Sequence, residues 1–97
     1  MTEVLPESAP DLVTRRKRLV FRAGHRGTKE ADMILGGFVR RHVDGWSHDD
    51  MAWFEMLLEE PDRDILAWIM RAEPAPEKFD TALMRAMQAL DYVTPDG

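Results

Sequence analysis

Apolar residues recur at helical spacing through the middle of this 97-residue chain. They lie at i, i+3, i+4, i+7 and i+11 within a helix that the pattern predicts from about Lys29 to His42. The residues on this face are Ala31, Ile34, Leu35, Phe38 and His42. No stretch of the sequence alternates apolar and polar residues for long enough to form a half-buried strand. The sequence therefore predicts an all-α fold.

Two adjacent glycines, Gly36 and Gly37, fall in the middle of the same predicted helix. Each should destabilise the helix by on the order of 1 kcal/mol relative to alanine. One explanation is a close helix–helix crossing at which a side chain would not fit. The alternative is a kink in the helix.

The N-terminal third predicts a second helix from about Leu12 to Ala23. Asp11 is suited to cap its start, and Gly24 is suited to end it. Residues 1–10 contain two prolines and acidic residues without periodicity, so we expect a flexible arm there.

Three further helices are predicted in the second half of the chain. One follows Ser47, which forms a capping-box pattern with Asp50, and a short one is capped by Asp62. A last helix begins near Glu77, after a stiff connector at residues 74–76. Their expected apolar faces are Met51, Phe54, Leu57 and Leu58, then Ile65, Leu66, Trp68 and Ile69, then Phe79, Leu83, Ala86, Met87 and Leu90. We therefore expect a compact single-domain bundle of five short helices over residues 11–92, followed by a frayed tail at 93–97.

Several classes of site and location are disfavoured by the composition. The chain has no cysteine, which excludes disulfides and thiolate metal sites and fits a reducing compartment. No apolar run approaches the roughly 20 residues that span a membrane, so no membrane insertion is expected. The acidic start of the chain lacks the basic residues of a secretory signal or a mitochondrial presequence. We therefore expect a cytoplasmic protein.

Charge is distributed unevenly along the chain. Seven of the 13 lysines and arginines lie between Leu12 and Lys29, and that stretch contains no acid. From Asp44 to Gly97, 13 acids face four bases, although the net charge of the whole chain is only −5. Such a distribution orients a protein on a partner of mixed charge. It fits a nucleic-acid-coating protein poorly, because that class is usually basic overall.

The residues Arg26 to Glu30, which we call the joint, connect the basic helix to the apolar one. Gly27 permits a sharp turn or the close approach of a partner, because it has no Cβ atom. Thr28 is suited to cap the next helix, and Glu30 and Asp32 fall in its first turn, where the helix dipole favours negative charge. His25 lies beside the joint, where a solvated loop histidine is the simpler interpretation.

Catalytic and metal sites are not predicted. His25, His42 and His48 have no metal-ligand spacing, and no nucleophile has an evident base beside it. We interpret Glu55 and Glu59 as a solvated face. Among the tryptophans, Trp68 is expected in the core, whereas Trp53 fits either an interface anchor or a partly buried ring.

The stretch from Arg22 to Asp32 resembles the Arg-Gly-x-x-Glu signature of the succinate dehydrogenase flavinylation factor family. Residues 54–58, the break at Pro61-Asp62, residues 64–68 and residues 74–77 resemble further blocks of that family in the same order. The resemblance covers roughly Leu12 to Leu90.

This resemblance implies an assembly factor that binds the flavoprotein subunit of succinate dehydrogenase and promotes covalent attachment of FAD to a histidine of that subunit. Fumarate reductase is a possible second client. The FAD belongs to the client, the factor has no cofactor or metal of its own, and it is not an enzyme. The acidic N-terminal residues lack the targeting sequence of the mitochondrial members, so in this respect the chain resembles the bacterial members of the family.

The resemblance also indicates the partner-binding residues. Arg26, Gly27 and Glu30 match the motif positions, and Asp32 matches a frequent acid that follows them. Arg22 and His25 extend this set. In the resulting hypothesis, Gly27 allows close backbone approach while Arg26 and Glu30 make charge-assisted contacts with the client.

Two other functions fit the residues alone. A small nucleic-acid-binding or antitoxin-like regulator would use the basic helix, and its binding would depend steeply on salt. A general helical adaptor would bind a different protein partner. The family resemblance favours neither.

Overall fold

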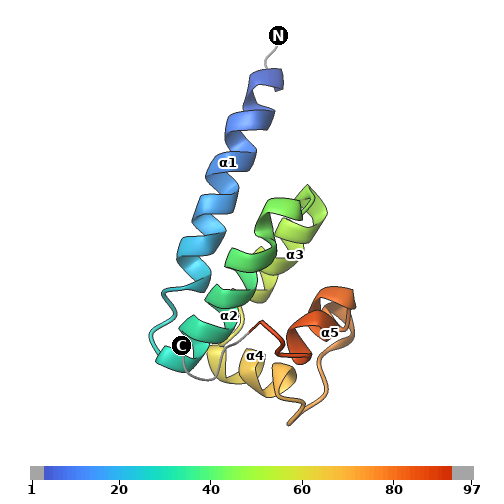
Figure 1. Ribbon diagram of the computed structural model, residues 1–97. Helices are drawn as coiled ribbons and strands as arrows, with labels where there is room; N and C mark the ends of the chain where they lie inside the picture. Colours follow the sequence, from blue (N-terminus) through green and yellow to red (C-terminus); the bar gives the residue numbers. More distant parts are fainter. Residues whose placement is uncertain (1–3, 93–97) are drawn as a thin grey trace.

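The computed structural model describes residues 4–92, and the side chains from residue 12 onward. The described residues form five α-helices and two short 3-10 helices without a strand (Figure 1). In chain order the elements are α1 (Val4–Ala23), α2 (Lys29–His42), η1 (Val43–Gly45), α3 (His48–Leu57), α4 (Asp62–Ile69), η2 (Glu77–Phe79) and α5 (Ala82–Gln88). The predicted all-α fold of five helices is confirmed.

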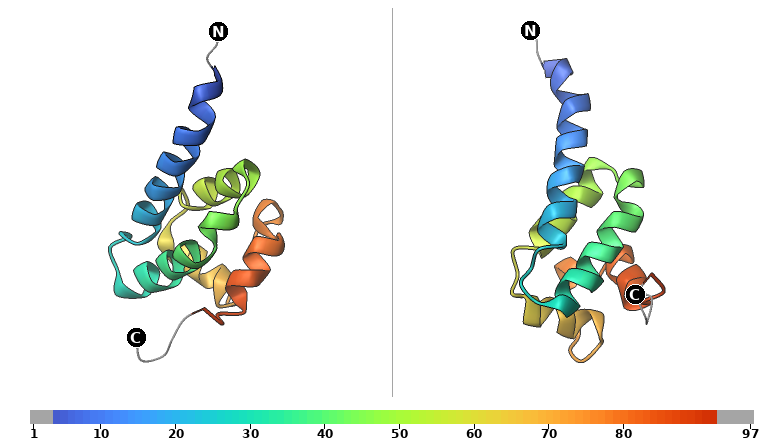
Figure 2. Two further views of the ribbon diagram at one scale, coloured as in Figure 1. Left: turned by 45° about the horizontal axis from the view of Figure 1, so that its top comes forward. Right: turned by 60° about the vertical axis from the view of Figure 1, so that its left-hand side comes forward.

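The longest helix, α1, lies against both α2 and α3, while α4 packs against α5 (Figure 1). Two further views show the N-terminal turns of α1 extending beyond the other helices (Figure 2). None of the helices in the described region combines the length and apolar character that a membrane crossing requires.

Aromatic rings form the centre of the core. Phe38 of α2 packs on Phe54 of α3 with ring centroids 6.1 Å apart, and Trp46 lies 5.2 Å from Phe54. A second group joins Trp68 of α4 to Phe79 at 5.6 Å. The core position predicted for Trp68 is confirmed. These contacts join α2 to α3 and α4 to η2.

The two central helices begin as their caps predict. The backbone N–H of Ala31 donates to Thr28 Oγ1 at 3.2 Å, and α2 spans the predicted residues. Ser47 and Asp50 form a reciprocal capping box at the start of α3, with both hydrogen bonds at 3.1 Å. Each cap satisfies backbone N–H groups that have no partner within the helix.

Two predicted helix starts are wrong. α1 begins at Val4 rather than near Leu12, so residues 4–10 are helical and not an irregular arm; Met1–Glu3 lie outside the described residues. Pro6 is compatible with this start because it falls in the first turn, where its missing N–H has no partner to lose. Asp62 does not cap α4 but is its first residue, after Pro61 in extended conformation.

The last predicted helix is divided in the structure. Residues 77–79 form η2, the chain then extends through Thr81, and α5 begins at Ala82. Ala86 is exposed, whereas Met84, which the sequence pattern did not indicate, is fully buried. The break shifts the helical register, so a different set of side chains faces the core. The frayed tail predicted at 93–97 lies outside the described residues.

Gly36 lies at a close crossing between α2 and the end of α1. A Cβ atom placed on Gly36 would be 3.0 Å from Gly24 Cα and 3.1 Å from an Arg40 guanidinium nitrogen. At Gly37 the nearest atom would be a Tyr92 ring carbon at 3.6 Å, an ordinary contact distance. Of the two explanations for the glycine pair, close packing accounts for Gly36.

This geometry predicts opposite effects for two alanine substitutions. Gly36→Ala gains helix propensity but overpacks the crossing, whereas Gly37→Ala gains the same propensity without a clash. Gly36→Ala should therefore unfold at lower urea concentration, with a free energy of unfolding at least about 1 kcal/mol below that of Gly37→Ala. Equal stability of the two variants would contradict the close crossing.

Candidate functional site

The joint is a tight turn that begins where α1 ends. Gly24 closes α1 with a backbone hydrogen bond to Val20 O at 3.1 Å. Gly27 then has φ of +112°, a conformation that side-chain-bearing residues rarely adopt. A Cβ atom on Gly27 would meet no atom within 4 Å, so this glycine is required by the backbone and not by crowding inside the molecule.

Arg26 fixes the joint to the junction of α3 and α4. Its Nε donates to Asp62 Oδ1 at 2.9 Å, and its Nη2 donates to Leu58 O, also at 2.9 Å. The Arg26 side chain is only 15% exposed. Both bonds reach the connection between α3 and α4, so the guanidinium is directed into the molecule. Arg26 thereby holds the turn against a rigid support.

Asp32 completes this arrangement from the first turn of α2. Its carboxylate accepts a hydrogen bond from the backbone N–H of Arg26. The turn is therefore held from both sides, by the Arg26 side chain and by a bond to the Arg26 backbone. Neither bond is evident from the motif alone, because both depend on which residues the fold brings close.

The centre of the joint faces solvent. Gly27, Thr28, Lys29 and Glu30 are all exposed. Within the described region the Glu30 carboxylate forms no hydrogen bond or ion pair, so its charge is stabilised there mainly by water and by the N-terminus of α2. The site is a rigid turn that displays backbone and one free carboxylate.

The other two predicted site residues lie on the α1 side of the joint. Arg22 forms an ion pair with Glu59 at 2.8 Å. His25 donates from Nδ1 to Phe21 O at 2.7 Å, and its exposed ring stacks on Phe21 with centroids 4.0 Å apart. These contacts direct Arg22 toward the turn that follows α3 and His25 back onto α1, and neither residue contacts Gly27 through them.

Ion pairs bind α1 to α3 and to the turn that follows α3. Arg15 donates twice to Glu55, at 2.8 and 2.9 Å, in parallel with the pair between Arg22 and Glu59. The Arg15 hydrogen bonds lower the pKa of Glu55 from its usual value of 4.5 against the opposing effect of burial, with the charges of Arg22 and Arg18 assisting. The interpretation of these two acids as a solvated face is therefore wrong for Glu55, which is partly buried in its pair, whereas Glu59 is exposed as predicted even though it pairs with Arg22.

Trp53 is partly buried at the edge of the bundle. Its indole N–H donates to Lys78 O at 3.3 Å, and its ring lies edge-on to Phe79 at 5.9 Å. The partly buried interpretation therefore accounts for its position. No cluster of histidine and carboxylate side chains within the described chain is arranged to hold a metal ion.

The Arg26 contact predicts a local stability effect. Asp62→Ala leaves a largely buried guanidinium without its charged partner, so the free energy of unfolding should fall by about 2 kcal/mol. Asp80→Ala removes the pair with Arg85, in which both side chains are 60% exposed, and should cost about 0.5 kcal/mol. Urea denaturation measures both values, and comparable losses would contradict the bracing role of Arg26.

The Glu55 pair predicts a pH-dependent contribution. A carboxyl whose pKa is lowered by folding stabilises the folded state above its unfolded pKa of about 4.5, and this contribution disappears as pH falls through the folded value. The stability difference between the wild type and Glu55→Gln should therefore be full above about pH 5 and shrink toward pH 3. Denaturation at several pH values tests this; a difference independent of pH would count against the ion pair.

Known proteins are similar to this chain over a region that includes the joint. A family model described as the flavinator of succinate dehydrogenase matches residues 17–91. The FAD assembly factor SdhE of Acetobacter pasteurianus is 40% identical over 77 residues, which cover 79% of this chain and 71% of that protein.

Mitochondrial relatives extend the comparison. Succinate dehydrogenase assembly factor 2 of Dictyostelium discoideum is 32% identical over 73 residues, covering 75% of this chain and 52% of that protein. The protein of the same name in Cryptococcus neoformans is 34% identical over 89 residues, covering 91% and 51%. The chain spans about half the length of these two relatives. Since the family model covers most of the chain, including the joint and the helices that support it, the chain belongs to the succinate dehydrogenase flavinator family.

Proposed function

We propose that this chain is an assembly factor that binds the flavoprotein subunit of succinate dehydrogenase and promotes the covalent attachment of FAD to it. Family membership supports the general role, as do the names of the relatives, which describe FAD assembly and succinate dehydrogenase assembly. The proposal is assigned to a specific surface by one observation. The turn at Gly27 is exposed, and the hydrogen bond of Arg26 to Asp62 holds it in place from inside the molecule.

In this proposal the client backbone packs directly against Gly27. The glycine has open space around it and presents no side chain, so a partner can approach its main-chain atoms. Glu30 lies one helical turn away with a free carboxylate at the start of α2. It would pair with a cation or with hydrogen-bond donors of the client, and such charge-assisted bonds are strong when water is excluded.

Arg26 and Asp32 act as positioning residues in this proposal. Their hydrogen bonds keep the turn in one conformation before the client arrives. A preformed turn loses less conformational entropy on binding than a flexible one, and this raises affinity without adding a contact. The role that we propose for Arg26 is thus support of the turn, and this refines the sequence hypothesis of a direct client contact.

We assign the flavin chemistry to the client. The FAD and the histidine that accepts it belong to the flavoprotein, and the factor holds a client conformation in which the attachment proceeds. The chain itself would bind no cofactor and catalyse no step. The basic α1 is less suited to nucleic acid than its composition indicates, because Glu55 and Glu59 neutralise Arg15 and Arg22.

A strain that lacks this protein provides the test. Covalent flavin fluorescence of the flavoprotein subunit on a denaturing gel should be lost, and the wild-type gene should restore it. Gly27→Arg should fail to restore it, because the new side chain blocks the turn while the helices remain folded.

Glu30→Gln should weaken client binding by roughly 2–5 kcal/mol if its carboxylate is buried against a charge.

Glu73→Gln is the matched control for Glu30→Gln, because it removes an exposed acid in the connection that follows α4. It should restore flavinylation fully. Circular dichroism confirms that every variant keeps its helices. A well-folded Gly27→Arg protein that supports normal flavinylation would overturn the assignment of the joint, and an unchanged flavin signal in the deletion strain would overturn the function.

A further inference from the structure

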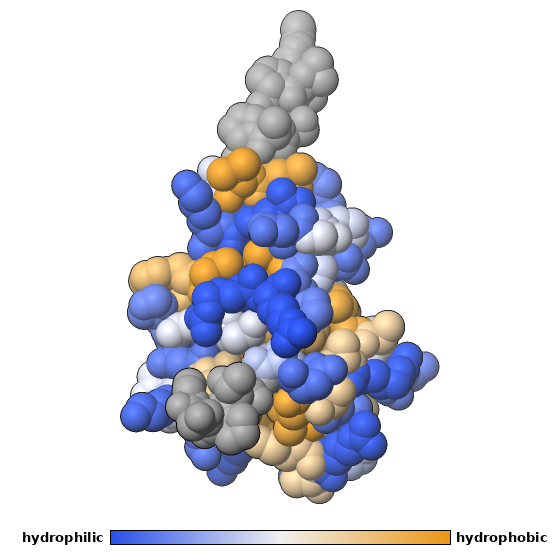
Figure 3. Space-filling model, viewed as in Figure 1, coloured by the Kyte–Doolittle hydropathy of each residue, from blue (hydrophilic) through white to orange (hydrophobic). Residues whose placement is uncertain are grey.

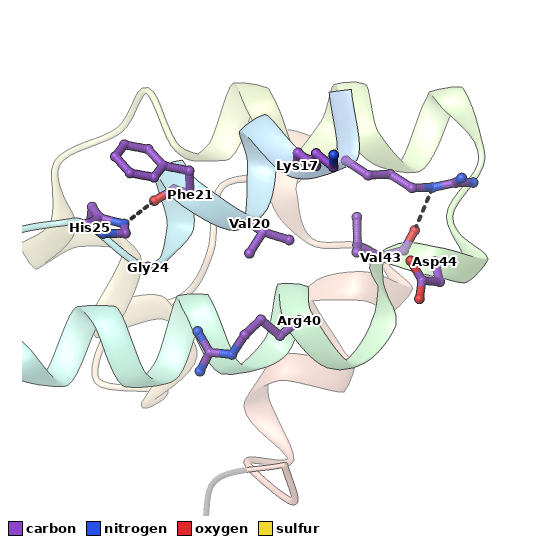
Figure 4. A pocket seen from close by; sticks show the side chains of 9 residues that line it. Lys17, Val20, Phe21, Gly24, His25, Arg40, Val43 and Asp44 are labelled. Carbon is purple, nitrogen blue, oxygen red and sulfur yellow. Dashed lines mark hydrogen bonds between the residues drawn. The ribbon is translucent and has the colours of Figure 1, made fainter. Parts of the chain in front are cut away.

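An open groove separates α1 from the C-terminal half of α2 and continues to η1 (Figure 4). Its volume is about 460 Å³, within the range of roughly 300–1,000 Å³ typical of ligand sites. Val20 and Val43 give it an apolar lining, and Phe21 lines its edge with 62% of its surface exposed. The space-filling view shows apolar patches between hydrophilic side chains on the molecular surface (Figure 3).

Two cations in the groove lack partners. Within the described region, Lys17 and Arg40 form no hydrogen bond or ion pair, and both are exposed. The Arg40 guanidinium lies across two glycines: Cβ atoms on Gly36 and Gly24 would be 3.1 and 3.6 Å from its Nη1. The glycines therefore leave room for this charge beside the apolar lining. Asp44 supplies a single acid, next to η1.

The cations on the two sides of α1 differ in whether they form ion pairs. On the side of α3, Arg15 and Arg22 each pair with a glutamate. On the side of α2, Lys17 has no such counterpart, although the chain as a whole is acidic. Lys17 and Arg40 thus place unneutralised positive charge beside an apolar lining, an arrangement complementary to a ligand that carries both carboxylates and an apolar group.

The groove also leads directly to the joint. Phe21 is held by its stacking with His25, whose ring N–H donates to the Phe21 carbonyl. His25 immediately precedes Arg26. An exposed aromatic ring fixed in position is typical of the residues that anchor protein interfaces. A partner seated on the Gly27 turn would therefore meet this ring at the edge of the same surface.

We propose that the groove binds an acidic segment of the flavoprotein subunit, with an apolar side chain against Val20 and Val43 and a carboxylate on Arg40. The inference rests on the proposed function and extends the contact surface from the joint onto α1. Because the carboxylate contact is electrostatic, affinity should fall as salt is added, and the salt dependence should depend on Arg40.

The test measures the dissociation constant of the purified flavoprotein subunit for the wild type and five variants, one of which is Gly27→Arg. Arg40→Glu should weaken binding about tenfold or more and reduce its salt dependence, because it places a like charge against the acidic segment. Phe21→Ala should weaken binding several-fold through loss of an apolar anchor. Both residues are exposed, so neither change should unfold the chain.

Matched controls are available for both changes. Arg18→Glu reverses an exposed charge on α1 outside the groove, and Met70→Ala truncates an exposed apolar side chain at the end of α4. Each should bind the client within about twofold of the wild type. Equal losses for Arg18→Glu and Arg40→Glu would indicate a general charge effect and overturn the groove assignment.

The remaining outcomes separate the two proposals. If the wild type binds, Gly27→Arg does not, and Arg40→Glu and Phe21→Ala bind normally, the joint stands and the groove proposal fails. If the wild type does not bind the flavoprotein, both fail. If the groove variants change the sedimentation of the factor alone and leave client binding intact, the groove holds a second copy of the chain and the proposal is overturned.

Discussion

The hydrogen bonds of Arg26 to Asp62 and Leu58 connect the two parts of the structure on which the proposed function depends. One part is the exposed turn at Gly27, and the other is the junction of α3 and α4 in the folded bundle. A glycine turn on its own would sample many conformations, because glycine is the least restricted residue. The hydrogen bonds of the largely buried guanidinium restrict that freedom. In the proposed function, the core therefore contributes to recognition by fixing a surface that it does not itself form.

Charge in this chain is organised by the fold and not by sequence proximity. Arg15 and Arg22 of α1 pair with Glu55 of α3 and with Glu59 just after it, so part of the apparent charge imbalance is neutralised inside the domain. Glu30 at the joint and Lys17 and Arg40 at the groove are among the charges that remain exposed. In the proposed function these exposed charges orient the partner, because exposed charges act over about 10 Å before salt screens them.

Local signals predicted much of the fold. The caps at Thr28 and Ser47 fixed the starts of α2 and α3, because a cap depends on residues only a few positions apart. The start of α1 was missed because the apolar periodicity begins only after residue 10. The break before α5 was missed because the periodicity continues through it. The sequence marked Gly27 and Glu30 as a candidate site through their motif. It could not reveal that Arg26 turns inward, because its partner lies 36 residues away in the chain.

Amide hydrogen exchange of the free and client-bound chain tests the central claim most directly. If the Gly27 turn is the contact surface, the amides of residues 27–30 should exchange much more slowly in the complex, whereas those of α5 should not change. These amides are exposed in the free chain, so bound client would be the source of their protection. Protection confined to other elements, with unchanged exchange at the joint, would contradict the account.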